Sequence, residues 1–168
     1  MMTNTRTLNV TTPSDCEIVV TRDFDAPRSL VWKAMSEPEL LKRWCYGPPG
    51  WSMVTVDDDL RVGGKYRWVW SHEDGKEMAL TGVYREVQPP ERVVRTEVFE
   101  FGCVPMPGEQ VSTMVLIEQA GRTMLTLTIV YASKEARDAA LATGMDSGMA
   151  AGYARVDELL ESLVKEEK

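Results

Sequence analysis

Hydrophobic and polar residues follow two different periods along the chain. Spacings of three and four predict two short helices between residues 27 and 44 and a closing helical region from residue 134. A period of two is typical of strands with one buried face. It predicts strands near residues 16–24, 51–56, 66–71, 77–87, 92–101, 110–118 and 123–131.

Residues at the ends of the predicted helices support these boundaries. Pro27 suits a first helical turn, and Ser36 with Glu39 has the spacing of a capping box before the second helix. Ser133 is expected to cap the closing region, which a break near Gly144 divides. The residues that mark the last helix as strongly amphipathic are Met145, Met149, Gly152, Tyr153, Val156, Leu160 and Leu163.

This element order predicts an α+β fold. About seven strands without crossover helices imply an antiparallel sheet, and a sheet of this length must curve. One long helix remains to cover the concave face, while the two early helices can plug only an edge or an end. We expect a single domain over residues 15–168 behind a flexible polar leader, residues 1–14.

Composition narrows the class of partner. The chain has 168 residues, a formal net charge of −7 and a pI near 4.8, which argues against a face for nucleic acid or an anionic membrane surface. No stretch reaches the length of a spanning helix. Cys16, Cys45 and Cys103 are odd in number and far apart, which predicts reduced thiols and a cytoplasmic location.

An ordered set of short motifs covers residues 17 to 164 and resembles one family. The motifs are Phe24-Asp25-Ala26-Pro27, Val31-Trp32-Lys33-Ala34, residues 60–65, residues 82–92, Thr96-Glu97, Gly144-Met145 with Gly148, and Asp157-Glu158-Leu159-Leu160. Together they are similar to the SRPBCC, or START-like, superfamily, in the bacterial branch named after the activator of the heat-shock chaperone ATPase. The resemblance implies the helix-grip fold. For function it implies hydrophobic-ligand binding, with some members that are cyclases or hydroxylase subunits.

A space between the curved sheet and the helix is a natural site for a small apolar molecule. Aromatic residues supply a flat wall for a ligand, or equally ordinary core filling, and methionines adapt to either use. Small residues such as Gly144, Gly148 and Gly152 let the helix approach the sheet or leave space for a ligand. The apolar and aromatic candidates for the cavity are Trp44, Trp51, Tyr66, Trp68, Trp70, Leu80, Phe99, Leu127, Ile129, Met145, Met149 and Tyr153.

Two charged residues, Arg95 and Glu97, share one face of a predicted strand. If that face is interior, the pair is the polar group that orients a carboxyl or hydroxyl of the ligand. Val94, Thr96 and Val98 could equally form the inner set, and the pattern does not decide between the faces. We favour a solvated pair on the outer face.

Metal, cofactor and nucleophile chemistry have little support in the sequence. His72 is the only histidine, no CxxC pair is present, and the residue lies beside a predicted Asp74-Gly75 turn, away from a cavity. Asp57, Asp58 and Asp59 alternate sides of a strand, so we expect a solvated strand end with one acid held by a neighbour. No catalytic residue, metal ligand or cofactor is assigned.

Three hypotheses for function remain. The first is a non-enzymatic binding protein for a small hydrophobic or aromatic molecule. The second is a cyclase-like or hydrolase-like enzyme that uses Glu97, Arg95 or Tyr153 as acid–base groups in the same cavity. The third is an interaction module that contacts another protein through its outer surface. A homodimer is compatible with each hypothesis, and the identity of the ligand is left open.

Overall fold

The computed structural model of the protein describes residues 8–102, 104–105 and 108–167. Residues 1–7 of the predicted leader and the predicted thiol Cys103 lie outside the described residues. The elements, in chain order, are β1 (Asn9–Thr11), β2 (Glu17–Phe24), α1 (Arg28–Ser36), α2 (Pro38–Trp44), β3 (Trp51–Asp58), β4 (Lys65–His72), β5 (Glu77–Gln88), β6 (Arg92–Phe101), β7 (Val104–Pro105), β8 (Gln110–Gln119), β9 (Arg122–Val130), α3 (Lys134–Ala142) and α4 (Met145–Glu166).

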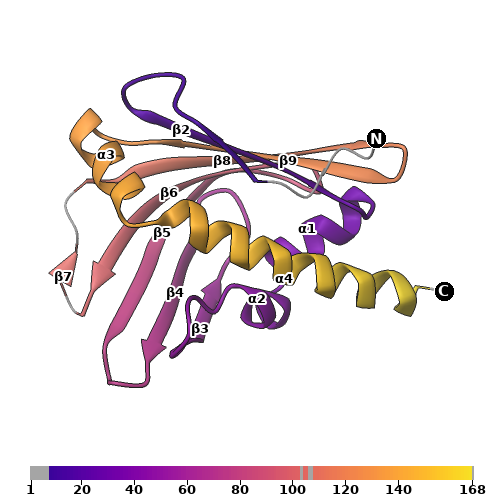
Figure 1. Ribbon diagram of the computed structural model, residues 1–168, viewed down its shortest axis with the longest axis horizontal. Helices are drawn as coiled ribbons and strands as arrows, with labels where there is room; N and C mark the ends of the chain where they lie inside the picture. Colours follow the sequence, from indigo (N-terminus) through magenta and orange to yellow (C-terminus); the bar gives the residue numbers. More distant parts are fainter. Residues whose placement is uncertain (1–7, 103, 106–107, 168) are drawn as a thin grey trace.

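All of these strands join one antiparallel sheet that curves beside α4 (Figure 1). Among the described residues the strand order is β1-β2-β9-β8-β6-β5-β4-β3, and β7 pairs with β6. Helices α1 and α2 follow β2 and both contact α4. The predicted helix-grip architecture, a curved antiparallel sheet with a long C-terminal helix and two short early helices, is confirmed.

Two short strands depart from the predictions. Residues 9–11 lie in the predicted flexible leader, but they form β1 and pair with residues 19–21 of β2, so the prediction is wrong for this segment. Strand β7 lies in the predicted loop after β6 and pairs with the end of β6. Each of these short strands forms backbone hydrogen bonds with a longer neighbouring strand. Such pairing does not require polar and apolar side chains to alternate, so no period-two pattern marks these strands in the sequence.

The alternation that predicts β2 also gives its burial. Ile18, Val20, Arg22 and Phe24 are buried, while the residues between them are partly exposed. Arg22 is an arginine in an otherwise apolar face, and its guanidinium forms a bidentate ion pair with Asp157 of α4, with both N–O distances 2.6 Å. This pair ties the closing helix to the sheet.

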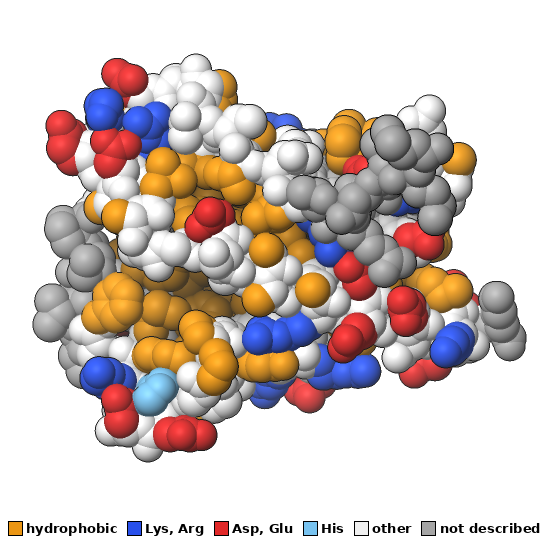
Figure 2. Space-filling view, in the orientation of Figure 1, with side chains coloured by type: hydrophobic (Ala, Val, Ile, Leu, Met, Phe, Trp, Pro, Cys, Tyr) orange, Lys and Arg blue, Asp and Glu red, His pale blue; other side chains and the backbone are white. Residues whose placement is uncertain are grey.

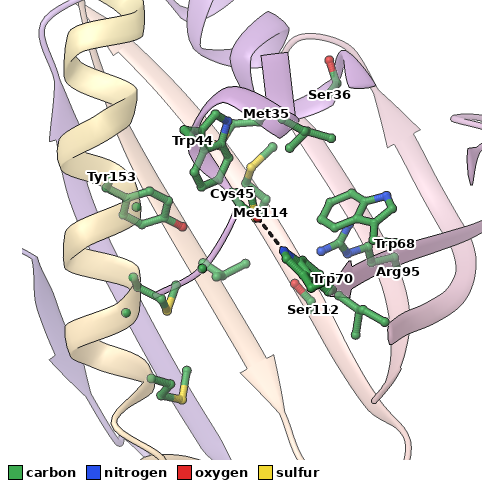
Figure 3. Close-up of a pocket in the computed structure, with 18 of the residues that line it drawn as sticks. Met35, Ser36, Trp44, Cys45, Trp68, Trp70, Arg95, Ser112, Met114 and Tyr153 are labelled. Atoms are coloured by element: carbon green, nitrogen blue, oxygen red, sulfur yellow. Dashed lines mark hydrogen bonds between the residues drawn. The ribbon is translucent and has the colours of Figure 1, made fainter. Parts of the chain in front are cut away.

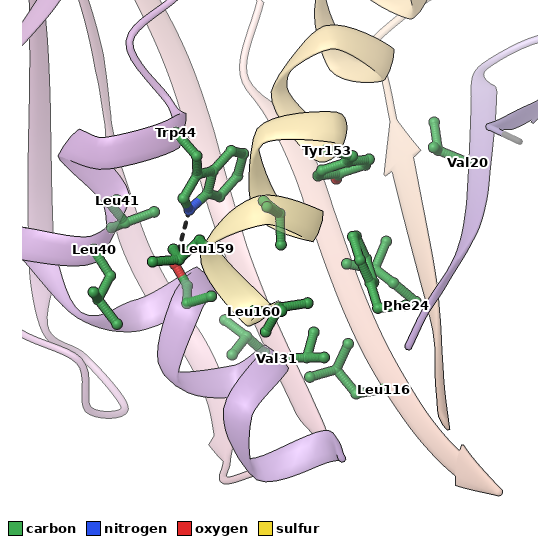
Figure 4. Close-up of a cluster of buried hydrophobic side chains, with 14 of the residues drawn as sticks. Val20, Phe24, Val31, Leu40, Leu41, Trp44, Leu116, Tyr153, Leu159 and Leu160 are labelled. Carbon is green, nitrogen blue, oxygen red and sulfur yellow. Dashed lines mark hydrogen bonds between the residues drawn. The ribbon is translucent and has the colours of Figure 1, made fainter. Parts of the chain in front are cut away.

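A cluster of buried side chains lies beside the C-terminal part of α4. There α4 contributes Val156, Leu159, Leu160 and Leu163, all buried, and α1 and α2 pack against it. Figure 4 shows side chains of these helices meeting side chains of the sheet in one continuous cluster. Other labelled members of that cluster are Val20, Phe24, Val31, Leu40, Leu41, Trp44, Leu116 and Tyr153.

The helix ends test the predicted caps. Ser133 caps α3 as expected, since its Oγ accepts a hydrogen bond from the backbone N–H of Ala136 at 3.1 Å. The capping box is wrong: Glu37 is the N-cap of α2, and the Ser36 hydroxyl donates to the carbonyl of Trp32 at 2.6 Å. Pro38 explains the shift, because a proline disfavours helical geometry in the residue before it.

Gly144 separates α3 from α4 with a backbone φ of +80°, which confirms the predicted break. No helix of the described residues is both long enough and apolar enough to cross a membrane.

Candidate functional site

A cavity of about 520 Å³ lies between the sheet and the N-terminal half of α4. Side chains from α1, α2, α4 and six strands form its wall, and most of that wall is apolar. Figure 2 shows the molecule hollowed on this side, with hydrophobic side chains around the hollow. A largely apolar cavity with a few polar groups is the usual form of a site for a small molecule.

The structure places eleven of the fourteen predicted residues in the cavity wall. They come from α2, α4 and the inner faces of five strands, so segments far apart in the sequence meet there. These residues are Trp44, Trp51, Trp68, Trp70, Leu80, Arg95, Phe99, Leu127, Met145, Met149 and Tyr153.

The other three predicted residues lie outside the cavity wall. Ile129 is buried in the core. Tyr66 packs beside Trp68, and its hydroxyl donates to the backbone carbonyl of Thr96 at 2.5 Å. Gly82 leaves room for this ring, since a Cβ atom at that position would lie 2.8 Å from Tyr66 Cε1. Glu97, the third, is buried behind Arg95.

Every tryptophan of the chain lines the cavity. Trp68 and Trp70 project from one face of β4, and their rings meet edge to face with centroids 6.4 Å apart. The indole N–H of Trp70 donates to the carbonyl of Cys45 at 2.6 Å, and that of Trp44 to the carbonyl of Ala34 at 2.9 Å. Because these N–H groups bond to the protein, the rings are fixed and present carbon surface to the cavity. Trp32 of α1 and Trp51 of β3 complete the group.

Arg95 and Glu97 form an interior ion pair, so the favoured interpretation of a solvated outer pair is wrong. Arg95 Nη2 and Nε donate to Glu97 Oε2 at 2.9 and 3.1 Å, and Gln110 donates to Glu97 Oε1 at 2.9 Å. The period-two pattern does not distinguish the two faces of β6, because Val94 and Thr96 on the other face are also buried.

Aromatic rings hold the Arg95 guanidinium in place. Its central carbon lies 4.7 Å from the ring centroid of Tyr66 and 4.5 Å from that of Trp68. Burial alone would lower the pKa of Arg95, but the Glu97 carboxylate, with Tyr66 and Tyr84, raises it. Arg95 is therefore a permanent cation of the cavity wall that is already paired within the protein.

Asp58 is a functional candidate, although the sequence pattern predicted a solvated strand end at this position. Asp59 is the acid held by a neighbour, Arg61, at 2.8 Å, as expected of a solvated strand end. Asp58 instead accepts hydrogen bonds from the Tyr84 hydroxyl at 2.7 Å and from the Trp68 indole at 3.1 Å. Burial raises the pKa of Asp58 although these two hydrogen bonds lower it, and burial also raises the pKa of Tyr84.

Several wall residues escaped the sequence reasoning. Ser112 and Met114 of β8 lie two residues apart before buried Leu116, a period of two that could have indicated them. Cys45 follows directly on α2, and burial raises the pKa of its thiol to about 11, although Arg95 and Arg155 lower it. No local pattern points to Cys45, because its burial comes from elements distant in sequence.

The residues of α4 that line the cavity all lie in its N-terminal half, up to Arg155. A Cβ atom at Gly148 would meet nothing within 4 Å, whereas one at Gly152 would touch Trp44 at 3.5 Å. Arg155 donates to the carbonyls of Trp44 and Gly47 at 3.2 and 3.1 Å, which fixes the chain after α2 against α4. His72 does not line the cavity; its imidazole contacts Asp74 at 2.9 Å.

The profile of the family described as Activator of Hsp90 ATPase homolog 1-like protein matches residues 25–161, most of the chain. The chain belongs to this family. The assignment confirms the predicted resemblance to the SRPBCC superfamily and its bacterial branch.

Solved structures agree with the membership in the Activator of Hsp90 ATPase homolog 1-like family. A protein of Rhodobacter sphaeroides is 30% identical, with a TM-score of 0.86 over 92% of this chain and 98% of its own. A protein of Mycobacterium smegmatis is 26% identical, with a TM-score of 0.81 over 94% and 99%. A protein of Arthrobacter aurescens, at 23% identity and a TM-score of 0.81 over 95% and 93%, shares the fold. No curated protein matches the chain.

Proposed function

We propose that the chain binds a small hydrophobic or aromatic molecule in the cavity between the sheet and α4. The observation that carries this proposal is a cavity of about 520 Å³ whose wall contains all five tryptophans and three methionines on α4 and β8. Fixed aromatic faces favour planar apolar groups, and methionine side chains adapt to their outline. Apolar surface removed from water supplies the binding free energy.

Filling the cavity tests this proposal. Met114 lines the cavity from β8, whereas Met124 on β9 is 41% exposed and does not. The variants Met114→Trp and Met124→Trp therefore make the same chemical change inside and outside the cavity. We expect the uncharged dye N-phenyl-1-naphthylamine to fluoresce strongly with wild type and Met124→Trp, and to bind Met114→Trp at least about tenfold more weakly, because the added indole occupies its volume.

Circular dichroism and the unfolding midpoint of each variant establish that the fold is retained. Equal binding by Met114→Trp and Met124→Trp, or no dye binding by the wild type, would contradict the proposal. Native mass spectrometry of freshly purified wild type adds a direct readout, since a co-purified molecule would increase the mass of the folded protein and be absent from Met114→Trp.

A cytoplasmic location fits this function. Cys16 and Cys45 are free thiols, which an oxidising compartment would not favour.

A further inference from the structure

Ser112 and Arg95 are direct neighbours on the inner face of the sheet. They are paired positions in the register of β8 and β6, and both line the cavity (Figure 3). Side chains at paired positions of antiparallel strands lie within reach of the same small group. Ser112 and Arg95 therefore supply polar groups to the same part of a largely apolar wall, with the guanidinium stacked on Tyr66 and Trp68.

The Ser112 hydroxyl has no hydrogen-bond partner among the described residues, although Ser112 is only 4% exposed. Tyr153, 6% exposed on the opposite wall, also has a hydroxyl without a partner in the described residues, and Figure 3 shows it directed toward the cavity. Both hydroxyls border the cavity, so each can form a hydrogen bond with a group that enters it. Both hydroxyls can donate, and therefore suit an acceptor oxygen.

The charged residues around the cavity determine whether a neutral or an anionic acceptor fits. Arg95 is already paired with Glu97, and Asp58 is a second carboxylate close to the same ring cluster through Trp68 and Tyr84. The cation at the other side of the cavity, Arg155, bonds to backbone carbonyls and stacks on Tyr46 at 3.9 Å. A ligand carboxylate beside Ser112 would add a third acid around one guanidinium, and a buried charge without a counter-charge is strongly unfavourable.

We infer that the ligand carries a neutral carbonyl group, as in a ketone, ester or amide, whose oxygen accepts a hydrogen bond from the Ser112 hydroxyl. The apolar part of the ligand packs against the tryptophans. This inference rests on the proposed function and adds the chemical class of the ligand.

Three probes with one apolar body test the inference: 2-acetylnaphthalene, 2-ethylnaphthalene and 2-naphthoate. Each competes with bound N-phenyl-1-naphthylamine on wild type, Ser112→Ala and Thr113→Ala. Thr113 is the next residue of β8 and does not line the cavity, so it is the matched control. Because the ketone and the hydrocarbon differ in affinity for water, the informative quantity is how their affinity ratio changes between proteins.

We expect Ser112→Ala to lower the ketone-to-hydrocarbon affinity ratio about five- to tenfold, the value of one hydrogen bond, and Thr113→Ala to leave it unchanged. Wild type should bind the ketone at least about tenfold more tightly than the carboxylate. A ratio unaffected by Ser112→Ala, or a carboxylate that binds best, overturns the neutral carbonyl while the apolar site stands. If the dye does not bind, or none of the three probes displaces it, the proposed function fails and this inference with it.

Discussion

Cys45 shows how strongly the cavity wall alters the chemistry of a single side chain. The thiol lines the cavity, and its burial outweighs the two arginines that favour the thiolate. With a pKa of about 11, the group is a thiol at neutral pH. Only the thiolate reacts quickly with alkylating reagents, so the wall protects this cysteine although it borders an open cavity.

In a Cys16→Ser/Cys103→Ser background, we expect Cys45 to react with iodoacetamide at pH 8 at least about a hundredfold more slowly than in the urea-unfolded chain, because burial suppresses the thiolate. The rate should rise with pH up to about 11, the pKa of the folded protein. Mass spectrometry of quenched samples gives both rates. Equal rates in the folded and unfolded chains would show that the thiol is not protected.

The glycine at position 148 lowers the stability of α4, and no close contact at this position requires a glycine. A Cβ atom there would meet nothing within 4 Å, and Gly148 lies within α4. Gly148→Ala should therefore raise the free energy of unfolding by up to about 1 kcal/mol, measured by urea denaturation. Gly152→Ala is the comparison, since its Cβ atom would touch Trp44. A lower free energy of unfolding for Gly148→Ala than for the wild type would show that the backbone at this position requires glycine.

At the scale of elements, a buried ion pair links α4 to the sheet. The Arg22 and Asp157 side chains are 4% and 11% exposed, so neither charge has water to replace a lost partner. Arg22 lies in β2 and Asp157 lies in α4, so the ion pair joins the first long strand to the last helix.

Removing one partner of this pair leaves the other charge buried. Arg22→Met should lower the free energy of unfolding by about 3 kcal/mol, and the double variant Arg22→Met/Asp157→Leu should recover most of the loss. Urea denaturation of both variants checks this. Lys134→Met, which removes an exposed pair with Asp138, should leave the unfolding midpoint nearly unchanged. A double variant as unstable as the single one would contradict the argument.

The elements were the part of the structure that the sequence predicted best. Period-two alternation identifies β4 because Tyr66, Trp68 and Trp70 are buried between exposed or half-exposed residues. It failed on β6, where both faces are buried, and so could not place Arg95 and Glu97. Strand β1 and the partners of Asp58 depend on pairing between distant segments, which no local pattern contains.

At the scale of the whole molecule, the two halves of α4 have different surroundings. From Val156 to Leu163 the helix packs into the core, whereas residues 145–151 border the cavity and are mostly exposed. Segments with fewer buried contacts open more readily. The fold therefore keeps its stable packing at one end of the helix and its binding cavity at the other.

Hydrogen exchange measured by mass spectrometry should resolve this division. We expect amides of residues 145–151 to exchange faster than those of residues 156–163, and to slow when N-phenyl-1-naphthylamine saturates the cavity. Amides of Met114→Trp should show no slowing with the dye. Uniform exchange along α4 would show that the helix opens as one unit.

The placement of the tryptophans has a spectroscopic consequence. Since the chain has five tryptophans and all five line the cavity, the indole emission of this protein comes from that wall alone. Occupancy of the cavity should change the intensity and wavelength of this emission, while events on the outer face of the sheet leave it almost unaltered. The intrinsic tryptophan fluorescence of the protein therefore reports whether the cavity is occupied. Unlabelled compounds can be screened in solution by this signal.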